Sequence, residues 1–337
     1  MLLEGLQLPL TTPFYADGRL NLRKLEQNVA AYSKSPAAGL AVLTKYGEAS
    51  ALSDEETIEV LEAAIQAAAP EKTMLAGISR GSVLGTVALA DHAARLGYDA
   101  ALVSPPSFLL EEGEQRGREL LTYFLSLADR SAIPLVIAGE VPEKIVAELA
   151  QNPRMIGAVR SGGIADLQQA TASVKHEVTV THVFSAVTAR MLARQKDTVT
   201  AEMLAGGTAV AVAPAGAALR TRTKTVGFQI LAGSTREMLD GLLAGAVGVM
   251  PAFAACAPQA CYEVFAAWKD GDHGLAEEKQ ARLNAVAEKV ENELGVAAVK
   301  FGCDFNGYAG GNPRLPRLPL SAAERQEVES LMQGLRN

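Results

Sequence analysis

The stretch NPRMIGAVRSGGIADL, residues 152–167, contains a short apolar run, a glycine pair and the start of a helical pattern. An apolar run without polar alternation is typical of a strand buried on both faces, as in parallel sheets. A glycine-rich turn after such a strand lets the backbone approach a ligand closely. The stretch therefore predicts one strand–turn–helix unit, and it raises the question of why the strand ends on Arg160.

The same order of an apolar run and a helical stretch recurs along the chain. The predicted strands are 5–10, 39–44, 73–78, 100–104, 134–138, 155–159, 228–232 and 246–250. Asn21 is suited to cap a helix at 22–32, and Ser53 with Glu56 forms a capping box. Eight such units predict a closed (β/α)8 TIM barrel, in the α/β class. An open doubly wound sheet is the alternative, although no GxGxxG motif follows the first strand to support it.

Residues 176–226 break this rhythm. They contain two further strand-like runs, 178–184 and 208–213, and a basic tail, RTRTK, at 220–224. No helix of the repeating pattern accounts for these runs. We therefore interpret the segment as an insertion between the sixth and seventh units.

The chain changes character after residue 255. Apolar residues follow a helical spacing over 258–294, and the proline-rich segment NPRLPRLPL at 312–320 is expected to be extended. We therefore predict a barrel domain at 1–255 and a C-terminal helical extension at 256–337.

Composition limits the classes of partner. The 337 residues are 49% hydrophobic and 20% charged with a net charge of −7, and no basic cluster favours nucleic acid or an anionic membrane. No apolar run approaches the roughly 20 residues of a membrane span. The start of the chain lacks the pattern of a signal peptide. Three cysteines show no metal-binding spacing. We expect a cytoplasmic protein with reduced thiols and with neither metal nor cofactor.

Four motifs carry a resemblance to a known family: TTPF (11–14), YGEASALSDEE (46–56), VKFG (299–302) and RLPRLPL (314–320). In these motifs the chain resembles the dihydrodipicolinate synthase and N-acetylneuraminate lyase superfamily. Its members are (β/α)8 class I aldolases and lyases that hold pyruvate as a Schiff base. The resemblance implies a 2-oxo acid such as pyruvate as the small anionic partner, and a homodimer or homotetramer as the assembly.

The positions that carry imine chemistry in this family differ here. The lysine at the end of the sixth strand is replaced by Val159, or by Arg160 after a shift of one residue, and neither supplies a usable amine. The tyrosine of Y-N-x-P after strand five is absent from AGEVP (138–142). The G-T-T-G-E motif reads TKYGE (44–48), and the tyrosine after strand four is replaced by Ser107. We therefore predict a degenerate active site.

The C-terminal strand ends form the site in barrels of this kind. The residues there are Thr12, Lys45, Tyr46, Ser79, Arg80, Ser104, Glu140, Arg160, Ser161, Ser234 and Arg236. Cations and hydroxyls in this set are suited to bind an anion through charge-assisted hydrogen bonds. We expect Arg80 and Arg236 to point outward to water.

Three residues are candidates for catalysis. Lys45 offers a relocated Schiff-base amine, and Tyr46 a proton donor beside it. Glu140 is suited to act as a general base or to pair with Lys45. Because adjacent residues of a strand point in opposite directions, Lys45 and Tyr46 reach the site together only if the strand has already ended.

Ligand binding is assigned to a second group of residues. This group is Thr12, Thr44, Ser104, Arg160, Ser161 and Gly162. Arg160 beside the glycine turn is suited to a carboxylate or phosphate, because a guanidinium donates two parallel hydrogen bonds. The competing interpretation is that Arg160 pairs with Glu140 and fills the space of the lost lysine.

Two functions follow from these residues. The first is an aldolase-like or lyase-like protein that acts on or binds a 2-oxo acid with altered site residues. The second is a non-catalytic barrel that binds an anionic metabolite or serves assembly. The family resemblance favours the first function, and the residues at the strand ends favour the second.

Overall fold

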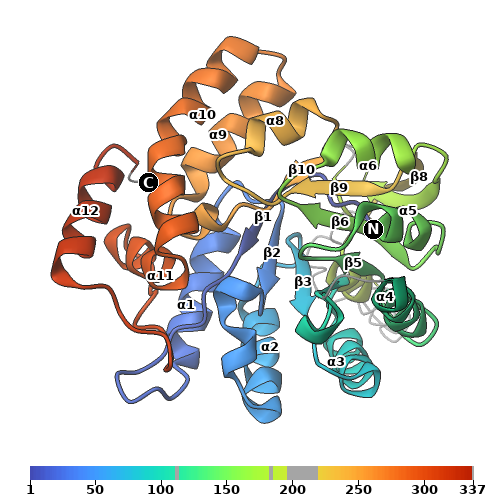
Figure 1. The fold of residues 1–337 in the computed structure, drawn as a ribbon, viewed down its shortest axis with the longest axis horizontal. Coiled ribbons are helices and arrows are strands. Elements are labelled where there is room, and N and C mark those ends of the chain that lie inside the picture. Colours follow the sequence, from blue (N-terminus) through green and yellow to red (C-terminus); the bar gives the residue numbers. More distant parts are fainter. Residues whose placement is uncertain (111–113, 182–184, 196–218, 336–337) are drawn as a thin grey trace, which may run out of the picture.

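The computed structural model describes residues 1–110, 114–181, 185–195 and 219–335. The barrel strands are β1 (Gly5–Pro9), β2 (Gly39–Val42), β3 (Thr73–Gly77), β4 (Ala100–Val103), β5 (Leu135–Ile137), β6 (Met155–Arg160), β9 (Gln229–Ala232) and β10 (Gly248–Val249). Within the described ranges these eight strands are parallel and close in the order β1-β10-β9-β6-β5-β4-β3-β2 (Figure 1). The predicted (β/α)8 barrel is confirmed, and the open sheet is not found.

Helices surround the strands (Figure 1). They are α1 (Leu22–Ser33), α2 (Asp54–Ala67), α3 (Val83–Leu96), α4 (Glu114–Ala128), α5 (Glu143–Leu149), α6 (Ile164–Ala170), α8 (Met238–Leu243) and α9 (Pro258–Lys269). The predicted helix starts form, because the Asn21 side chain caps α1 and the Ser53–Glu56 capping box caps α2. Each cap satisfies backbone N–H groups that have no partner within the helix.

Alternation along each strand divides the core into two layers. In β2, Ala41 joins a small cluster with Leu75 and Leu102 that fills the inside of the barrel. Its neighbours Leu40 and Val42 join the larger cluster between strands and helices. Strands buried on both faces therefore read as continuous apolar runs, which is the pattern found in the sequence.

The predicted insertion lies between β6 and β9. Its strands β7 (His176–Thr181) and β8 (Thr221–Val226) pair antiparallel in a separate two-stranded sheet. The predicted run 208–213 lies outside the described residues. Ala189 N donates to the carboxylate of Asp99 (2.6 Å), which directly precedes β4. The insertion therefore docks at the N-terminal end of the barrel, opposite the strand ends that form the candidate site.

The C-terminal extension contains α10 (His273–Ala287), the π-helical turn η5 (Glu288–Glu293), α11 (Val296–Phe305) and α12 (Ala322–Met332). In Figure 1 these helices lie together on one side of the barrel. The preceding α9 packs beside β1. The domain limits 1–255 and 256–337 stay a prediction. In the described part of the chain, the helices are all too short or too polar to cross a membrane.

Candidate active site

The C-terminal ends of the strands surround a cavity of about 400 Å³. Its apolar wall includes Leu102, Val159 and Met250. Its polar lining consists of Thr44, Lys45, Tyr46, Ser50, Ser79, Ser104, Glu140, Ser161 and Arg317. Two cations, one carboxylate and several hydroxyls therefore share one cavity, which suits a small anionic ligand.

The structure brings together all three predicted catalytic residues on this cavity, Lys45, Tyr46 and Glu140. Three of the predicted binding residues, Thr44, Ser104 and Ser161, also line it. These placements show only that the residues are neighbours. Their roles stay predictions.

Three other predicted binding residues lie elsewhere. Thr12 is buried, and its hydroxyl donates to the carbonyl of Gly47 (2.7 Å), so it supports the loop after β2. Arg160 and Gly162 line a separate hollow of about 270 Å³ that also contains the carboxylates of Asp166, Glu237 and Asp240. Three acidic side chains there oppose the binding of an anion.

The end of β6 explains why Arg160 is separated from the cavity. Val159 lines the cavity, and alternation turns its neighbour Arg160 toward the other face of the sheet. Arg160 Nη1 donates to the carbonyl of Val141 (2.6 Å) rather than pairing with Glu140. The arginine therefore ties the end of β6 to the loop after β5, and its role in ligand binding stays a prediction.

The loop after β2 brings both Lys45 and Tyr46 to the cavity. The strand ends at Val42, and Leu43 adopts a positive φ of 60°. The short helix η1 (Lys45–Gly47) follows, capped by the Thr44 hydroxyl, which accepts from Tyr46 N (3.3 Å). Because the strand has ended, adjacent side chains no longer point to opposite faces. The left-handed backbone of Leu43 is a strained conformation of the kind that clusters at functional sites.

Lys45 and Tyr46 contact one another. Lys45 Nζ lies 5.6 Å from the centroid of the Tyr46 ring, in cation–π geometry. Burial raises the pKa of the Tyr46 hydroxyl, and the nearby Glu291 carboxylate raises it further. The phenol is therefore protonated at neutral pH and is suited to donate a proton or a hydrogen bond.

Sequence reasoning missed Glu291. The η5 turn carries this residue to the loop after β9, where its carboxylate accepts a hydrogen bond from the Thr235 hydroxyl. Burial raises the pKa of Glu291, while hydrogen bonds and the charge of Lys45 lower it. Inserted π-helical turns often occur at functional sites, but nothing in the sequence marks this one.

The motifs that carried the family resemblance meet beside the cavity. Lys300 and Glu48 are both fully buried, and Lys300 Nζ donates to Glu48 Oε1 (2.6 Å). Arg314 donates to both carboxylate oxygens of Glu56 (2.6 and 2.7 Å) and stacks on Phe14. The ion pairs join the C-terminal extension to the loop after β2. The buried ion pair gives Lys300 a structural position between these segments.

The two arginines expected to point outward are both turned away from the cavity. Arg80 Nε pairs with Asp54 (2.9 Å), and the Arg80 side chain is only 20% exposed. Arg236 pairs with Glu288 (2.8 Å) and is 58% exposed. Arg236 faces water as expected, whereas Arg80 is held against the start of α2.

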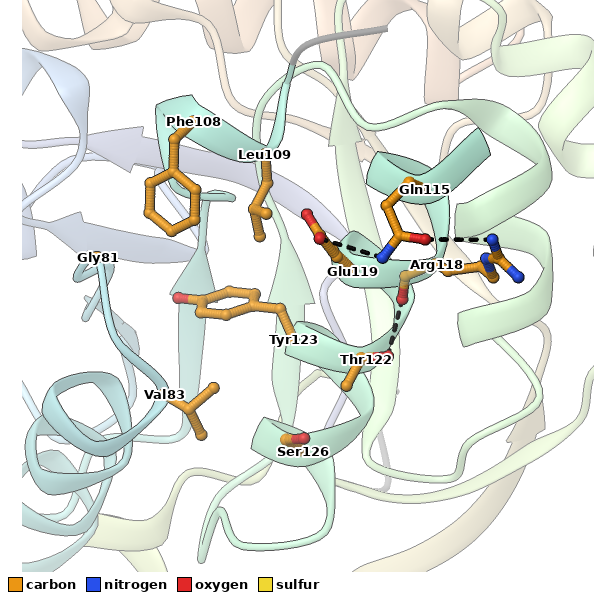
Figure 2. Close-up of a pocket in the computed structure, with 10 residues that line it drawn as sticks. All are labelled: Gly81, Val83, Phe108, Leu109, Gln115, Arg118, Glu119, Thr122, Tyr123 and Ser126. Atoms are coloured by element: carbon orange, nitrogen blue, oxygen red, sulfur yellow. Dashed lines mark hydrogen bonds between the residues drawn. The ribbon is translucent and has the colours of Figure 1, made fainter. Parts of the chain in front are cut away.

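A larger hollow of about 540 Å³ lies beside the mouth, between α3 and α4. Figure 2 shows Phe108 and Tyr123 facing it, while Gln115 bonds with Glu119 and with Arg118. These polar side chains are hydrogen-bonded to one another in this hollow. Among the residues that the structure describes, no group of His, Cys, Asp and Glu side chains is arranged to hold a metal ion. The mouth cavity therefore remains the candidate site.

Comparison with known proteins agrees with the barrel and its motifs. The model of the dihydrodipicolinate synthetase family matches residues 2–215 and 211–335. The chain belongs to this family. The 4-hydroxy-tetrahydrodipicolinate synthase of Acidiphilium cryptum is 27% identical over 339 residues, covering 98% of each chain.

Solved structures of the dihydrodipicolinate synthetase family share the fold. Dihydrodipicolinate synthase DapA-2 from Bacillus anthracis aligns over the full length of both chains, with a TM-score of 0.77 and 16% identity. The family member YagE, a prophage protein from E. coli K12 solved in complex with pyruvate, covers 99% of each chain, with a TM-score of 0.75 and 20% identity.

Proposed function

We propose that the mouth cavity binds a small 2-oxo acid such as pyruvate, and that the chain acts on it as an aldolase or lyase. The observation that carries the proposal is the amine of Lys45 beside the protonated phenol of Tyr46 on the cavity wall. The pyruvate complex of the E. coli family member supports the class of ligand.

In this proposal, Lys45 replaces the lysine that the sixth strand lacks. Its neutral amine attacks the carbonyl carbon, and the carbonyl oxygen leaves as water after accepting two protons. Tyr46 is the nearby proton donor. Glu140 is suited to accept a proton from the ligand's methyl carbon, which converts the nitrogen-protonated imine to a neutral enamine. The hydroxyls of Ser104 and Ser161 offer hydrogen bonds to the bound acid.

Binding without catalysis is the second candidate, and the exposure of Lys45 favours it. A lysine becomes a good nucleophile when burial favours its neutral form, and an exposed amine lacks that help. In this case Lys45 serves only as a cation that attracts the ligand. The degenerate site would then hold an anionic metabolite or serve assembly.

We also propose a homodimer or homotetramer in the cytoplasm, without nucleic acid or membrane partners and without a cofactor. Buried free thiols at Cys256, Cys261 and Cys303 suit a reducing compartment. Exposed apolar side chains near the mouth, Leu84 and Phe108, suit contact with a second copy.

Deuterium exchange at the methyl group of pyruvate tests the catalytic proposal without a second substrate. An imine that forms an enamine exchanges these protons with D₂O, and the loss of the methyl proton signal is followed by NMR. We expect exchange by the wild type and by the exposed-surface control Lys24→Met, but not by Lys45→Met. Calorimetric binding of pyruvate without exchange supports the second candidate instead. Absence of both binding and exchange rejects the 2-oxo acid as ligand.

A further inference from the structure

Arg317 reaches the mouth cavity from a distant part of the sequence. It ends a turn at 314–317 between α11 and α12, in which Arg317 N donates to the carbonyl of Arg314 (3.1 Å), so this part of the proline-rich segment is not extended as predicted. Arg317 lines the same cavity as Lys45 and Tyr46. Its side chain is 38% exposed, so the guanidinium combines contact with the cavity and access to solvent.

Arg317 is loosely held. Its one ion pair in the described part of the chain joins Nη1 to Glu48 Oε2 at 3.7 Å, which is longer than a hydrogen bond. The Glu48 carboxylate is already bound by Lys300 Nζ (2.6 Å) and by Arg314 N (3.1 Å). Glu48 therefore does not need Arg317, and the guanidinium keeps donors for another partner.

The cavity offers two cations to the carboxylate of a ligand, Lys45 and Arg317. Lys45 and Tyr46 occupy the positions at which the family's G-T-T-G-E motif has threonines. If Lys45 reacts with the carbonyl carbon, it does not serve as the anchor for the acid group. The lining carries a net charge of +1 from Lys45, Arg317 and Glu140. A single carboxylate neutralises this charge.

We propose that Arg317 binds the carboxylate of the ligand and so positions its carbonyl group toward Lys45. This inference rests on the proposed function, and it makes Arg317 a binding and specificity-determining residue. A planar guanidinium binds a carboxylate through two parallel hydrogen bonds, which fixes orientation as well as charge. Selectivity for acids over their esters then arises from a residue of the C-terminal segment.

The test compares pyruvate with its uncharged methyl ester by calorimetry. The wild type is expected to prefer pyruvate, and Arg317→Ala to weaken pyruvate binding by about 10- to 100-fold, as expected for charged hydrogen bonds, with little change for the ester. Arg317→Lys keeps the charge but loses the planar fork, and it should give intermediate affinity. The control Arg236→Ala, at a strand end outside the cavity, should match the wild type.

The outcomes separate the two proposals. If the wild type binds neither compound, the proposed function fails and this inference fails with it. If the wild type binds pyruvate but Arg317→Ala binds it equally well, or loses both compounds alike, the role of Arg317 is overturned while the proposed function stands. A thermal melt of each variant shows whether an equal loss reflects unfolding.

Discussion

Val159 presents a branched apolar side chain to the mouth cavity from the end of the sixth strand, the position at which the resemblance places the family's lysine. Valine can neither form an imine nor bind an anion. The next residue, Arg160, is turned to the other face and bonded to Val141. Because the strand continues through residues 159 and 160, their side chains point to opposite faces of the sheet and lie in different environments.

Restoring an amine at this position is an informative change. We predict that Val159→Lys in the Lys45→Met background reacts with pyruvate, because position 159 lines the cavity. Borohydride reduction followed by peptide mapping should place the adduct on the peptide of residues 155–167. A folded double variant that forms no adduct would show that the ligand does not reach this wall.

Loss of the buried ion pair between Lys300 and Glu48 should lower the stability of the fold. Lys300→Met leaves the carboxylate of Glu48 buried without its main partner, which is expected to destabilise the fold by about 3–5 kcal/mol. Urea unfolding of this variant and of the exposed control Lys24→Met measures the difference. The control should stay within about 0.5 kcal/mol of the wild type. Equal stability of the two variants would contradict a structural role for Lys300.

At the scale of elements, local signals were enough to predict the strands and the helix starts. Strands buried on both faces leave continuous apolar runs, and caps such as Ser53 with Glu56 act over three residues. The groups that reach the site from far away left no such signal. Arg317 and Glu291 lie hundreds of residues from β2, and only the folded extension brings them near it.

The stability that the Arg314–Glu56 ion pair gives to the start of α2 should decrease at acidic pH. Arg314 holds the pKa of Glu56 below its usual value of 4.5 by hydrogen bonding to the ionised carboxylate. The stabilisation is complete above pH 4.5, where the unfolded chain is also ionised, and it is lost as the pH falls through the lower pKa of the folded chain. Glu56→Gln keeps an acceptor for the capping box but removes the charge. The stability deficit of this variant should therefore be largest near neutral pH and should shrink below pH 4.5 in urea titrations. A deficit that is independent of pH would contradict the ion pair.

At the scale of the whole molecule, the two additions to the barrel lie in different places. The insertion bonds to Asp99 at the N-terminal end, whereas the C-terminal extension contributes Arg317 to the mouth. The sequence marked both additions as departures from the repeating units. Their contacts could not be predicted, because docking depends on groups far apart in the sequence.

The oligomeric state is also a property of the whole molecule. We predict at least a dimer at micromolar concentration, because Leu84 is 73% exposed and Phe108 is 52% exposed on the rim beside the mouth. Light scattering measures the mass directly, and Phe108→Ser should shift it toward the monomer. A wild-type mass near 35.3 kDa would remove this prediction.

We propose that imine chemistry has moved from the sixth strand to the loop after the second. Incubation with pyruvate and borohydride, followed by peptide mapping by mass spectrometry, tests it most directly. We expect an adduct on the peptide that contains Lys45 and none on residues 155–167. An adduct on any other lysine, or no adduct from folded protein that binds pyruvate, would contradict it.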